Sequence, residues 1–315
     1  MKISKELKKS NGLKYLVTGG AGFIGSNLTE RLVSEGHEVI VVDNLSTGSL
    51  KNLRAVKDKI KFIKFPVAKI LKSKAIKDLD GIYHYGIPSS TPLYRENPYF
   101  VGEAINEFIA ILELAKREKC KIVYASSSSV YNGNPTPFVE TMPVLVKDLY
   151  TEARYAMERL AKLYYNWYKV NVISIRFFSV YGPHEEAKKN YANLVTQFLW
   201  LAKKGQKPVI YGDGNQTRDF TFVKDIIEGC VLAMNSKVEN DVFNIGAGFQ
   251  YTINDMVKML EKALNKKIEC RYAPNPLQGY VYETWADTSK AQKVLGFKPQ
   301  YPFEKGLEEI IQYYK

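Results

Sequence analysis

A glycine-rich turn near the amino terminus limits what this chain can fold into more than any other feature. The segment VTGGAGFIGSNL spaces Gly19, Gly22 and Gly25 as GxxGxxG between an apolar strand pattern and an amphipathic helix pattern. Glycines allow a tight turn and a close approach of the backbone to a ligand, and the following helix offers free N–H groups at the positive end of its dipole. This combination predicts a strand, turn and helix that bind the pyrophosphate of a dinucleotide.

An acidic residue follows this turn at the spacing that a dinucleotide site requires. Asp43 ends the second strand pattern, EVIVVDN, 18 residues after Gly25. A carboxylate at that place accepts hydrogen bonds from the hydroxyls of an adenosine ribose and repels a 2′-phosphate. The sequence therefore favours NAD over NADP as the cofactor.

Strand and helix patterns alternate through the first half of the chain. This alternation predicts a Rossmann-type α/β fold, in which a doubly wound parallel sheet carries helices on both faces. We expect residues 1–178 to form the NAD-binding Rossmann domain, with returning segments near 220–247, and residues 179–315, which are rich in Gly, Pro and Asn loops, to form mainly a smaller C-terminal α/β substrate-binding lobe. The predicted strands are KYLVTGG, EVIVVDN, IKFIKF, DGIYHYG, CKIVYASSS and VNVISIRFF.

A tyrosine and an arginine begin one of the predicted helices, in the segment DLYTEARYAMERLAKLYY. Tyr150 and Arg154 are four positions apart, so they share one face of the helix. A phenol titrates near pH 10 and acts as a base at neutral pH only when a nearby cation favours the phenolate. Arg154 supplies such a cation, and the serine run at the end of CKIVYASSS offers a hydroxyl donor beside it.

Composition excludes several other classes of protein. No apolar run approaches the ~18 residues of a membrane span, and three widely spaced cysteines fit a reducing cytoplasm better than a disulfide framework. The net charge of +12 comes from scattered lysines and arginines without a nucleic-acid-binding motif, so we interpret it as solvated surface. With three histidines and no spaced acidic cluster, we expect no metal site.

From residue 14 to 315 the chain resembles the extended short-chain dehydrogenase/reductase family, in particular its nucleotide-sugar epimerases and dehydratases. The segments that carry the resemblance are VTGGAGFIGSNL, VVDNLSTG, SSSSVY, the Tyr150 helix, RFFSVYGP, YGDGNQTRDFTFVKD, VFNIGAG and TWADTSKAQKVLGFKP. The family's helix motif is YxxxK, whose lysine holds the nicotinamide ribose and lowers the pKa of the tyrosine. This chain has YxxxR, and because guanidinium and ammonium groups differ in shape, the exchange is not conservative.

The resemblance implies an epimerase rather than a dehydratase. Ser127 stands where the family has its catalytic serine or threonine, and Ser128 and Ser129 replace the Asp and Glu that eliminate water in the 4,6-dehydratases. Without those carboxylates, elimination lacks its acid and base. The implied activity is that of an NAD-dependent UDP-hexose 4-epimerase, in which Tyr150, Arg154 and Ser127 act on a sugar hydroxyl and a transient 4-keto sugar forms.

The resemblance also implies two sets of binding residues and a homodimer formed by the helices near 100–117 and 151–168. The cofactor set is Gly19, Gly22, Phe23, Ile24, Gly25, Asp43, Asn44, Ser46, Thr47, Gly48, Tyr150 and Arg154. The substrate set, for a nucleotide-diphosphate sugar, is Ser127, Ser128, Ser129, Ser179, Lys188, Asn193, Tyr211, Gln216, Arg218 and Tyr280. Arg218 matches an arginine that contacts the substrate phosphates, a contact that a guanidinium makes well.

Several departures from the family pattern keep other activities open. Ser179 replaces the usual Asn, Pro66 stands where relatives often place an Asp against adenine, and PLQGY replaces the Arg-x-Gly-Asp of many UDP-hexose 4-epimerases. The loop YGPHEEAKKNYAN, with Lys188, resembles the ADP-heptose 6-epimerase branch. The alternatives are therefore a heptose-type 6-epimerase, an NDP-sugar reductase, and a low-activity or non-catalytic NAD-binding scaffold that the lysine-to-arginine exchange at Arg154 would explain.

Overall fold

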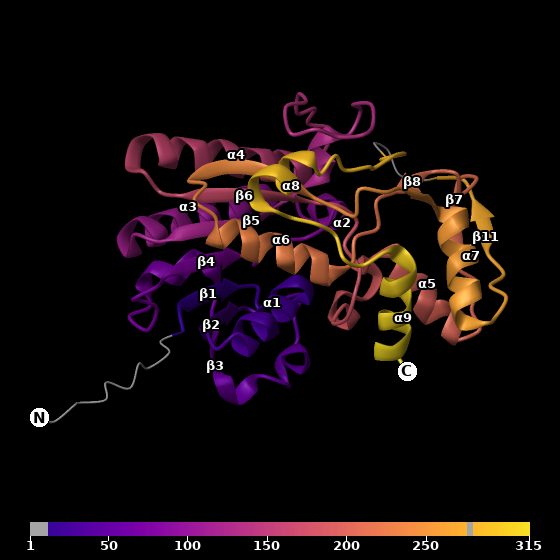
Figure 1. Ribbon diagram of the computed structural model, residues 1–315, viewed down its shortest axis with the longest axis horizontal. Coiled ribbons are helices and arrows are strands. Elements are labelled where there is room, and N and C mark those ends of the chain that lie inside the picture. Colours follow the sequence, from indigo (N-terminus) through magenta and orange to yellow (C-terminus); the bar gives the residue numbers. More distant parts are fainter. Residues whose placement is uncertain (1–11, 276–279) are drawn as a thin grey trace, which may run out of the picture.

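A seven-stranded parallel sheet forms the centre of the molecule (Figure 1). The computed structural model describes residues 12–275 and 280–315. The strand order is β3-β2-β1-β4-β5-β6-β9, and every neighbouring pair is parallel. The six predicted strands are confirmed as the first six. The bounds are β1 Lys14–Thr18, β2 Glu38–Asp43, β3 Ile60–Lys64, β4 Gly81–His84, β5 Lys121–Ser127, β6 Val172–Phe177 and β9 Asn240–Ile245.

Both faces of this sheet are buried, as the continuous apolar strands require. In β1, Tyr15 and Val17 pack into the core on one face, while Leu16 packs into the core on the other. The first face is covered by α1 Phe23–Ser34, α6 Val223–Asn235 and α8 Ser289–Leu295. The second is covered by α2 Thr91–Glu96, α3 Phe100–Glu118 and α4 Leu149–Tyr168, together with the 3-10 helix η3 Val67–Lys72.

The chain leaves the sheet after β6 and returns to it later. Helix α6 and strand β9 both fall within the predicted returning segment near 220–247, and β9 pairs with β6. The boundary at residue 178 stays a prediction.

A smaller lobe lies at the right of Figure 1 and has its own apolar core. Its helices are α5 Leu194–Lys203, α7 Ile253–Leu264 and α9 Phe303–Tyr313. Its strands β7 Val209–Tyr211 and β11 Arg271–Ala273 form a parallel pair, and β8 Thr217–Arg218 and β10 Tyr251–Thr252 an antiparallel one. The remaining 3-10 helices of the described chain are η1 Leu50–Leu53, η2 Lys57–Lys59, η4 Ser128–Tyr131 and η5 Glu186–Tyr191.

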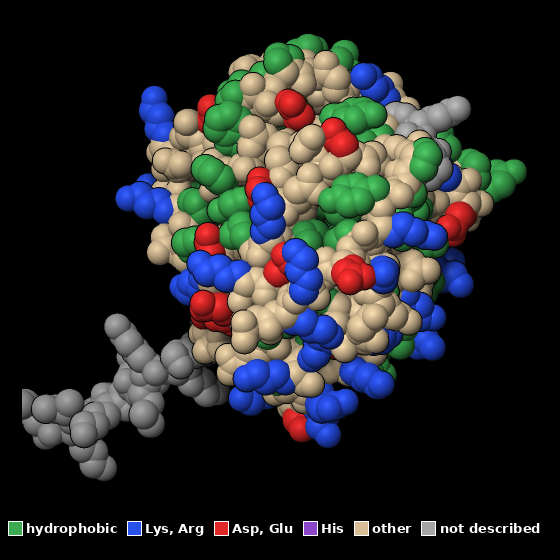
Figure 2. Space-filling model, turned by 90° about the vertical axis from the view of Figure 1, so that its right-hand side faces the viewer, with side chains coloured by type: hydrophobic (Ala, Val, Ile, Leu, Met, Phe, Trp, Pro, Cys, Tyr) green, Lys and Arg blue, Asp and Glu red, His purple; other side chains and the backbone are tan. Residues whose placement is uncertain are grey.

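The surface of this end of the molecule carries many basic side chains. Figure 2 shows Lys and Arg side chains over the middle and lower part of the face, with fewer Asp and Glu side chains between them. Across the two described ranges, no helix combines the length and apolarity needed to cross a bilayer.

Candidate active site

A cavity of about 570 Å³ lies at the carboxyl ends of the central strands. Its wall is formed by residues that follow β1, β2, β4, β5 and β6, by helices α1, α3 and α4, and by the loop before α5. Ligands of open parallel sheets bind at this edge. The cavity therefore occupies the place that the glycine turn predicted.

The glycine turn has the geometry of a cradle for an anion. Gly19 has a φ of +67°, and a Cβ atom added at Gly25 would lie 2.2 Å from the carbonyl oxygen of Gly19. Helix α1 begins at Phe23, and no side chain among the described residues caps it. Its first N–H groups are therefore left for a ligand, and the cavity reaches them at Phe23 and Ile24. The turn fits the pyrophosphate of a dinucleotide.

Asp43 is held rigidly at the edge of the same cavity. Its Oδ2 accepts a hydrogen bond from the N–H of Ala21 at 2.9 Å, and its Oδ1 accepts one from Leu45 at 2.7 Å. Burial raises the pKa of Asp43, while these backbone donors act to lower it. The carboxylate keeps lone pairs for ribose hydroxyls. All twelve residues of the predicted cofactor set line the cavity.

Tyr150 and Arg154 lie one turn apart at the start of α4, whose amino end is capped by Asp148 through the N–H of Thr151 at 2.9 Å. The Cζ of Arg154 lies 4.9 Å from the centre of the Tyr150 ring. The guanidinium also donates from Nη1 to the carbonyl of Ala125 at 2.9 Å and from Nη2 to that of Pro88 at 2.8 Å. Arg154 therefore ties α4 to the ends of β4 and β5 while keeping its charge beside Tyr150.

The serines at the end of β5 do not all face the cavity. Ser127 and Ser128 line the cavity, and the hydroxyl of Ser127 accepts a hydrogen bond from the N–H of Ser129 at 3.1 Å. The Ser127 hydroxyl therefore keeps its own O–H free to donate. Ser129 is not part of the cavity wall, and its buried hydroxyl has no partner among the described residues.

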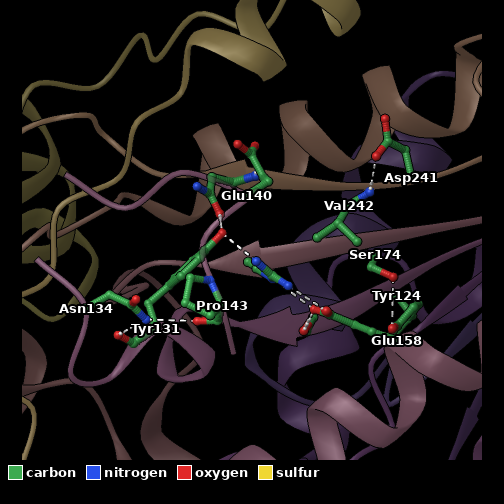
Figure 3. A network of polar contacts seen from close by, with 12 residues as sticks. Tyr124, Tyr131, Asn134, Glu140, Pro143, Glu158, Ser174, Asp241 and Val242 are labelled. Carbon is green, nitrogen blue, oxygen red and sulfur yellow. Dashed lines mark hydrogen bonds and ion pairs between the residues drawn. The ribbon is translucent and has the colours of Figure 1, made fainter. Parts of the chain in front are cut away.

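A buried polar network joins α4 to strands β5, β6 and β9 (Figure 3). Glu158 on α4 accepts from Ser126 at 2.6 Å and from two nitrogens of Arg176 on β6, at 3.0 and 2.7 Å. Arg176 in turn donates to the hydroxyl of Tyr131 at 2.6 Å, which donates to Asn244 on β9 at 2.8 Å. The network fixes α4 against the sheet. This network was not predicted from the sequence, although Glu158 lies one helical turn after Arg154.

Apart from the three serines after β5, the predicted substrate residues fall into two groups. Ser179, Lys188 and Asn193 line the cavity, and the Nζ of Lys188 lies 3.6 Å from Glu185 and 5.2 Å from the centre of the Phe23 ring. Ser179 has a φ of +28°, a left-handed conformation in which asparagine is more common than serine.

The second group lies in the smaller lobe and does not line the cavity. Gln216 donates to the carbonyl of Tyr211 at 2.8 Å and to the hydroxyl of Tyr280 at 3.3 Å. The Cζ of Arg218 lies 5.1 Å from the centre of the Tyr280 ring, and its Nη1 donates to the carbonyl of Thr217 at 2.7 Å. Most of the PLQGY segment, residues 276–279, lies outside the described residues.

Two acidic residues of α3 line the cavity and were not singled out from the sequence. Glu103 and Glu107 are four positions apart, a spacing that places both on one helix face. Of the histidines, His84 hydrogen-bonds to Thr18 and His184 to Ser26, each through Nδ1. No group of three or more potential metal ligands occurs within the described part of the chain.

Comparisons with known proteins agree with this geometry. Residues 15–246 match the model of the NAD dependent epimerase/dehydratase family. A putative UDP-glucose 4-epimerase of Methanocaldococcus jannaschii is 33% identical over 307 residues, which cover 95% of this chain and 98% of that protein.

Two solved structures share the fold over 96% of this chain. The UDP-N-acetylglucosamine 4-epimerase of Methanobrevibacter ruminantium M1, solved with UDP-N-acetylmuramic acid, is 30% identical, with a TM-score of 0.89 and 98% of that chain covered. The ADP-L-glycero-D-manno-heptose-6-epimerase of Helicobacter pylori is 25% identical, with a TM-score of 0.86 and 96% of that chain covered. Together with the glycine cradle, Asp43 at the cavity edge and the Tyr150 helix, these matches show that the chain belongs to the NAD-dependent epimerase/dehydratase family and takes NAD as its cofactor.

Proposed function

We propose that this NAD-dependent nucleotide-sugar epimerase inverts C4 of a UDP-hexose through a transient 4-keto sugar. The observation that carries the proposal is that Tyr150 and Ser127 line the same cavity as the glycine turn and Asp43. A sugar carbon held between the tyrosine and the dinucleotide has both groups that an alcohol oxidation needs.

The residues of the cavity divide the acid–base work. Tyr150, as the phenolate, removes the proton of the sugar hydroxyl and returns it after the ring has turned. Ser127 donates a hydrogen bond to the same sugar oxygen. Its hydroxyl oxygen already accepts from the N–H of Ser129, which leaves its O–H to donate. Arg154 keeps a positive charge beside the phenol. NAD, when bound, takes up and gives back the hydride at the same carbon.

The polar groups beside Ser127 support epimerisation over elimination. Ser128 and Ser129 carry hydroxyls where an elimination would need an acid and a base. The other cavity carboxylates, Glu103 and Glu107, come from α3 rather than from the end of β5. For these reasons we propose inversion without loss of water.

Two further features belong to the same proposal. Leu163, Trp167 and Tyr168 leave an exposed apolar surface on α4, and the indole of Trp167 is 67% exposed. We propose that this surface and α3 form a homodimer, since exposed apolar patches of this kind mark contacts between chains. We also propose a cytoplasmic location, in keeping with the three free cysteines.

Lys188 favours one alternative. It lines the cavity, and its ammonium group lies 5.2 Å from the centre of the ring of Phe23, the first residue of α1, while it pairs with Glu185 at 3.6 Å. A second acid–base group facing the sugar from this side would suit inversion at C6 of a heptose, as in the branch that the loop resembles.

A panel of substrates tests the proposal. Purified protein is incubated in turn with UDP-glucose, UDP-GlcNAc, UDP-glucuronate and ADP-heptose, and each product is followed by NMR. We expect the C4 epimer of a UDP-hexose. Inversion of ADP-heptose alone would replace the proposal with the alternative, and turnover of none of them with NAD bound would indicate a scaffold.

Tyr150→Phe is the matched variant for this assay. It removes only the hydroxyl, so we expect roughly a hundredfold or greater loss of turnover while NAD stays bound. Retained turnover in this variant would contradict the role given to Tyr150.

A further inference from the structure

Glu107 is a buried carboxylate in the wall of the NAD cavity that the proposed reaction does not use. Its side chain is 6% exposed, and Oε1 accepts a hydrogen bond from the N–H of Ala68 at 3.1 Å, in the first turn of η3. Within residues 12–275 and 280–315, that is the only hydrogen bond its carboxylate makes, and no lysine, arginine or histidine pairs with it. A buried carboxylate without a charged partner is costly, so a ligand that offers a donor there gains affinity.

The order of the sheet tells which end of the cavity Glu107 faces. Asp43 ends β2 and marks the ribose, and the neighbouring strand β3 leads into Phe65, Val67 and then Ala68, the partner of Glu107. Tyr150 and Arg154 lie on the opposite side, against the ends of β4 and β5. Glu107 therefore lies beyond the ribose of the adenosine half and away from the reacting end.

The other groups at this end of the cavity are apolar. Phe65, Val67 and Ile87 line it, and Pro66 between them has neither a backbone N–H nor a polar side chain. Of the donors of NAD, the adenosine ribose hydroxyls would face Asp43, and the nicotinamide ribose hydroxyls and the carboxamide belong to the reacting end. The exocyclic amino group of adenine is the donor that remains for a carboxylate placed here.

We infer that Glu107 recognises the adenine base of NAD, its carboxylate accepting a hydrogen bond from the exocyclic amino group. In this assignment Glu107 on α3 supplies the hydrogen-bond acceptor for adenine that the side chain of Pro66, after β3, cannot supply. The inference concerns the cofactor and not the sugar, so it stands or falls separately from the choice of substrate.

A competition between two dinucleotides tests it by binding alone. At pH 8.5, where the carboxylate of Glu107 is ionised, the protein is equilibrated with an equimolar excess of NAD and nicotinamide hypoxanthine dinucleotide, in which a carbonyl oxygen replaces the amino group. Free nucleotide is removed, the protein is denatured, and the two released dinucleotides are quantified by chromatography. We expect about tenfold or more NAD over the analogue, because the carbonyl oxygen would face a carboxylate oxygen.

Matched variants separate base recognition from support of η3. Glu107→Gln keeps an acceptor for Ala68 and adds an amide N–H that can donate to the hypoxanthine carbonyl, so the bound ratio is expected to approach one or reverse. Glu107→Ala is expected to lose the preference as well, and Glu113→Gln, on the same helix but outside the cavity wall, to keep it.

Two outcomes would overturn the inference. The wild-type protein binding both dinucleotides equally would do so without any variant, whatever the folding of the mutants. A Glu107→Gln protein that folds, judged by circular dichroism, and retains the full wild-type ratio would leave Glu107 as a support for η3 only.

Discussion

The guanidinium of Arg154 contacts two main-chain carbonyls, those of Pro88 and Ala125, as well as the ring of Tyr150. Its planar fork suits this double contact, which a lysine in the same place could not reproduce. The arginine of the YxxxR motif is therefore built into the structure. The cation faces the ring of Tyr150, and part of its charge is spread towards the carbonyl oxygens.

Arg154→Lys tests this arrangement. A lysine concentrates the charge in one ammonium group, so we expect a higher kcat at neutral pH. Loss of a charged hydrogen bond to a buried carbonyl is expected to cost about 1 to 3 kcal/mol of stability. The measurements are the pH profile of kcat and urea unfolding, and a pH profile identical to that of the wild type would contradict the role of the cation.

Glu107 makes the stability of the fold depend on pH. Burial is the main cause that raises its pKa to about 7, the hydrogen bond from Ala68 opposes the rise, and the charge of Glu103 adds to it. The folded protein therefore holds this proton more tightly than the unfolded chain, whose Glu pKa is about 4.3. This contribution to stability is fully present below about pH 4.3 and is lost as the pH rises through 7, by roughly 4 kcal/mol.

Glu107→Gln removes this dependence. Without added nucleotide, we expect the variant to raise the melting temperature clearly at pH 8 and little at pH 5, because only the ionised carboxylate is penalised. Glu308→Gln is the control, since Glu308 lies on α9 and is exposed to solvent. Equal effects of Glu107→Gln at the two pH values would show that burial does not set the pKa of this group.

At the scale of the elements, α4 is joined to the sheet by the ion pair between Glu158 and Arg176 (Figure 3). Both side chains are nearly fully buried, at 6% and 4% exposed. Contacts from Ser126, Tyr131 and Asn244 extend this pair from β5 to β9. The position of Tyr150 over the cavity therefore depends on polar contacts two turns further along its helix.

Removing one partner of this pair is expected to be costly. Glu158→Gln leaves the guanidinium of Arg176 buried without its counter-charge, and we expect a loss of about 3 to 5 kcal/mol in urea unfolding. The exposed pair Glu152 and Arg159, on the same helix at 3.1 Å, is the control, and Glu152→Gln is expected to cost less than about 1 kcal/mol. Similar losses in the two variants would contradict the importance of the buried network.

At the scale of the whole molecule, Asp219 joins the end of the large sheet to the smaller lobe. It follows β8, and its carboxylate accepts hydrogen bonds from the N–H groups of Ala247 at 2.8 Å, Gly248 at 3.1 Å and Ala286 at 3.0 Å. These donors come from the segment after β9 and from the chain before α8. One fully buried carboxylate therefore joins its own segment to two distant ones, the segment after β9 and the chain before α8.

Asp219→Asn replaces one acceptor oxygen by a donor that faces backbone N–H groups. We expect a loss of about 2 kcal/mol or more in urea unfolding, because buried N–H groups lose their partner. Asp213→Asn, on an exposed loop of the same lobe, is expected to change stability by about 0.5 kcal/mol or less. An equally small effect at Asp219 would show that the three segments are held by apolar packing alone.

The sequence by itself determined the parallel sheet, the glycine cradle, Asp43 and the pairing of Tyr150 with Arg154. These features depend on neighbours within one strand, turn or helix, and such short spacings are readable as periodicity and turn chemistry. The expected domain division, with returning segments near 220–247, stays a prediction; α6 and β9 lie within that range.

Only the tertiary structure decided which polar groups meet. The two carbonyls bound by Arg154 come from Pro88 and Ala125, and the donor to Glu107 comes from Ala68, each many residues away. In the folded chain, Ser129 and Arg218 do not line the cavity, although both lie in segments that match the family. Contacts between distant segments depend on how helices pack on the sheet, and no local pattern in the chain records that packing.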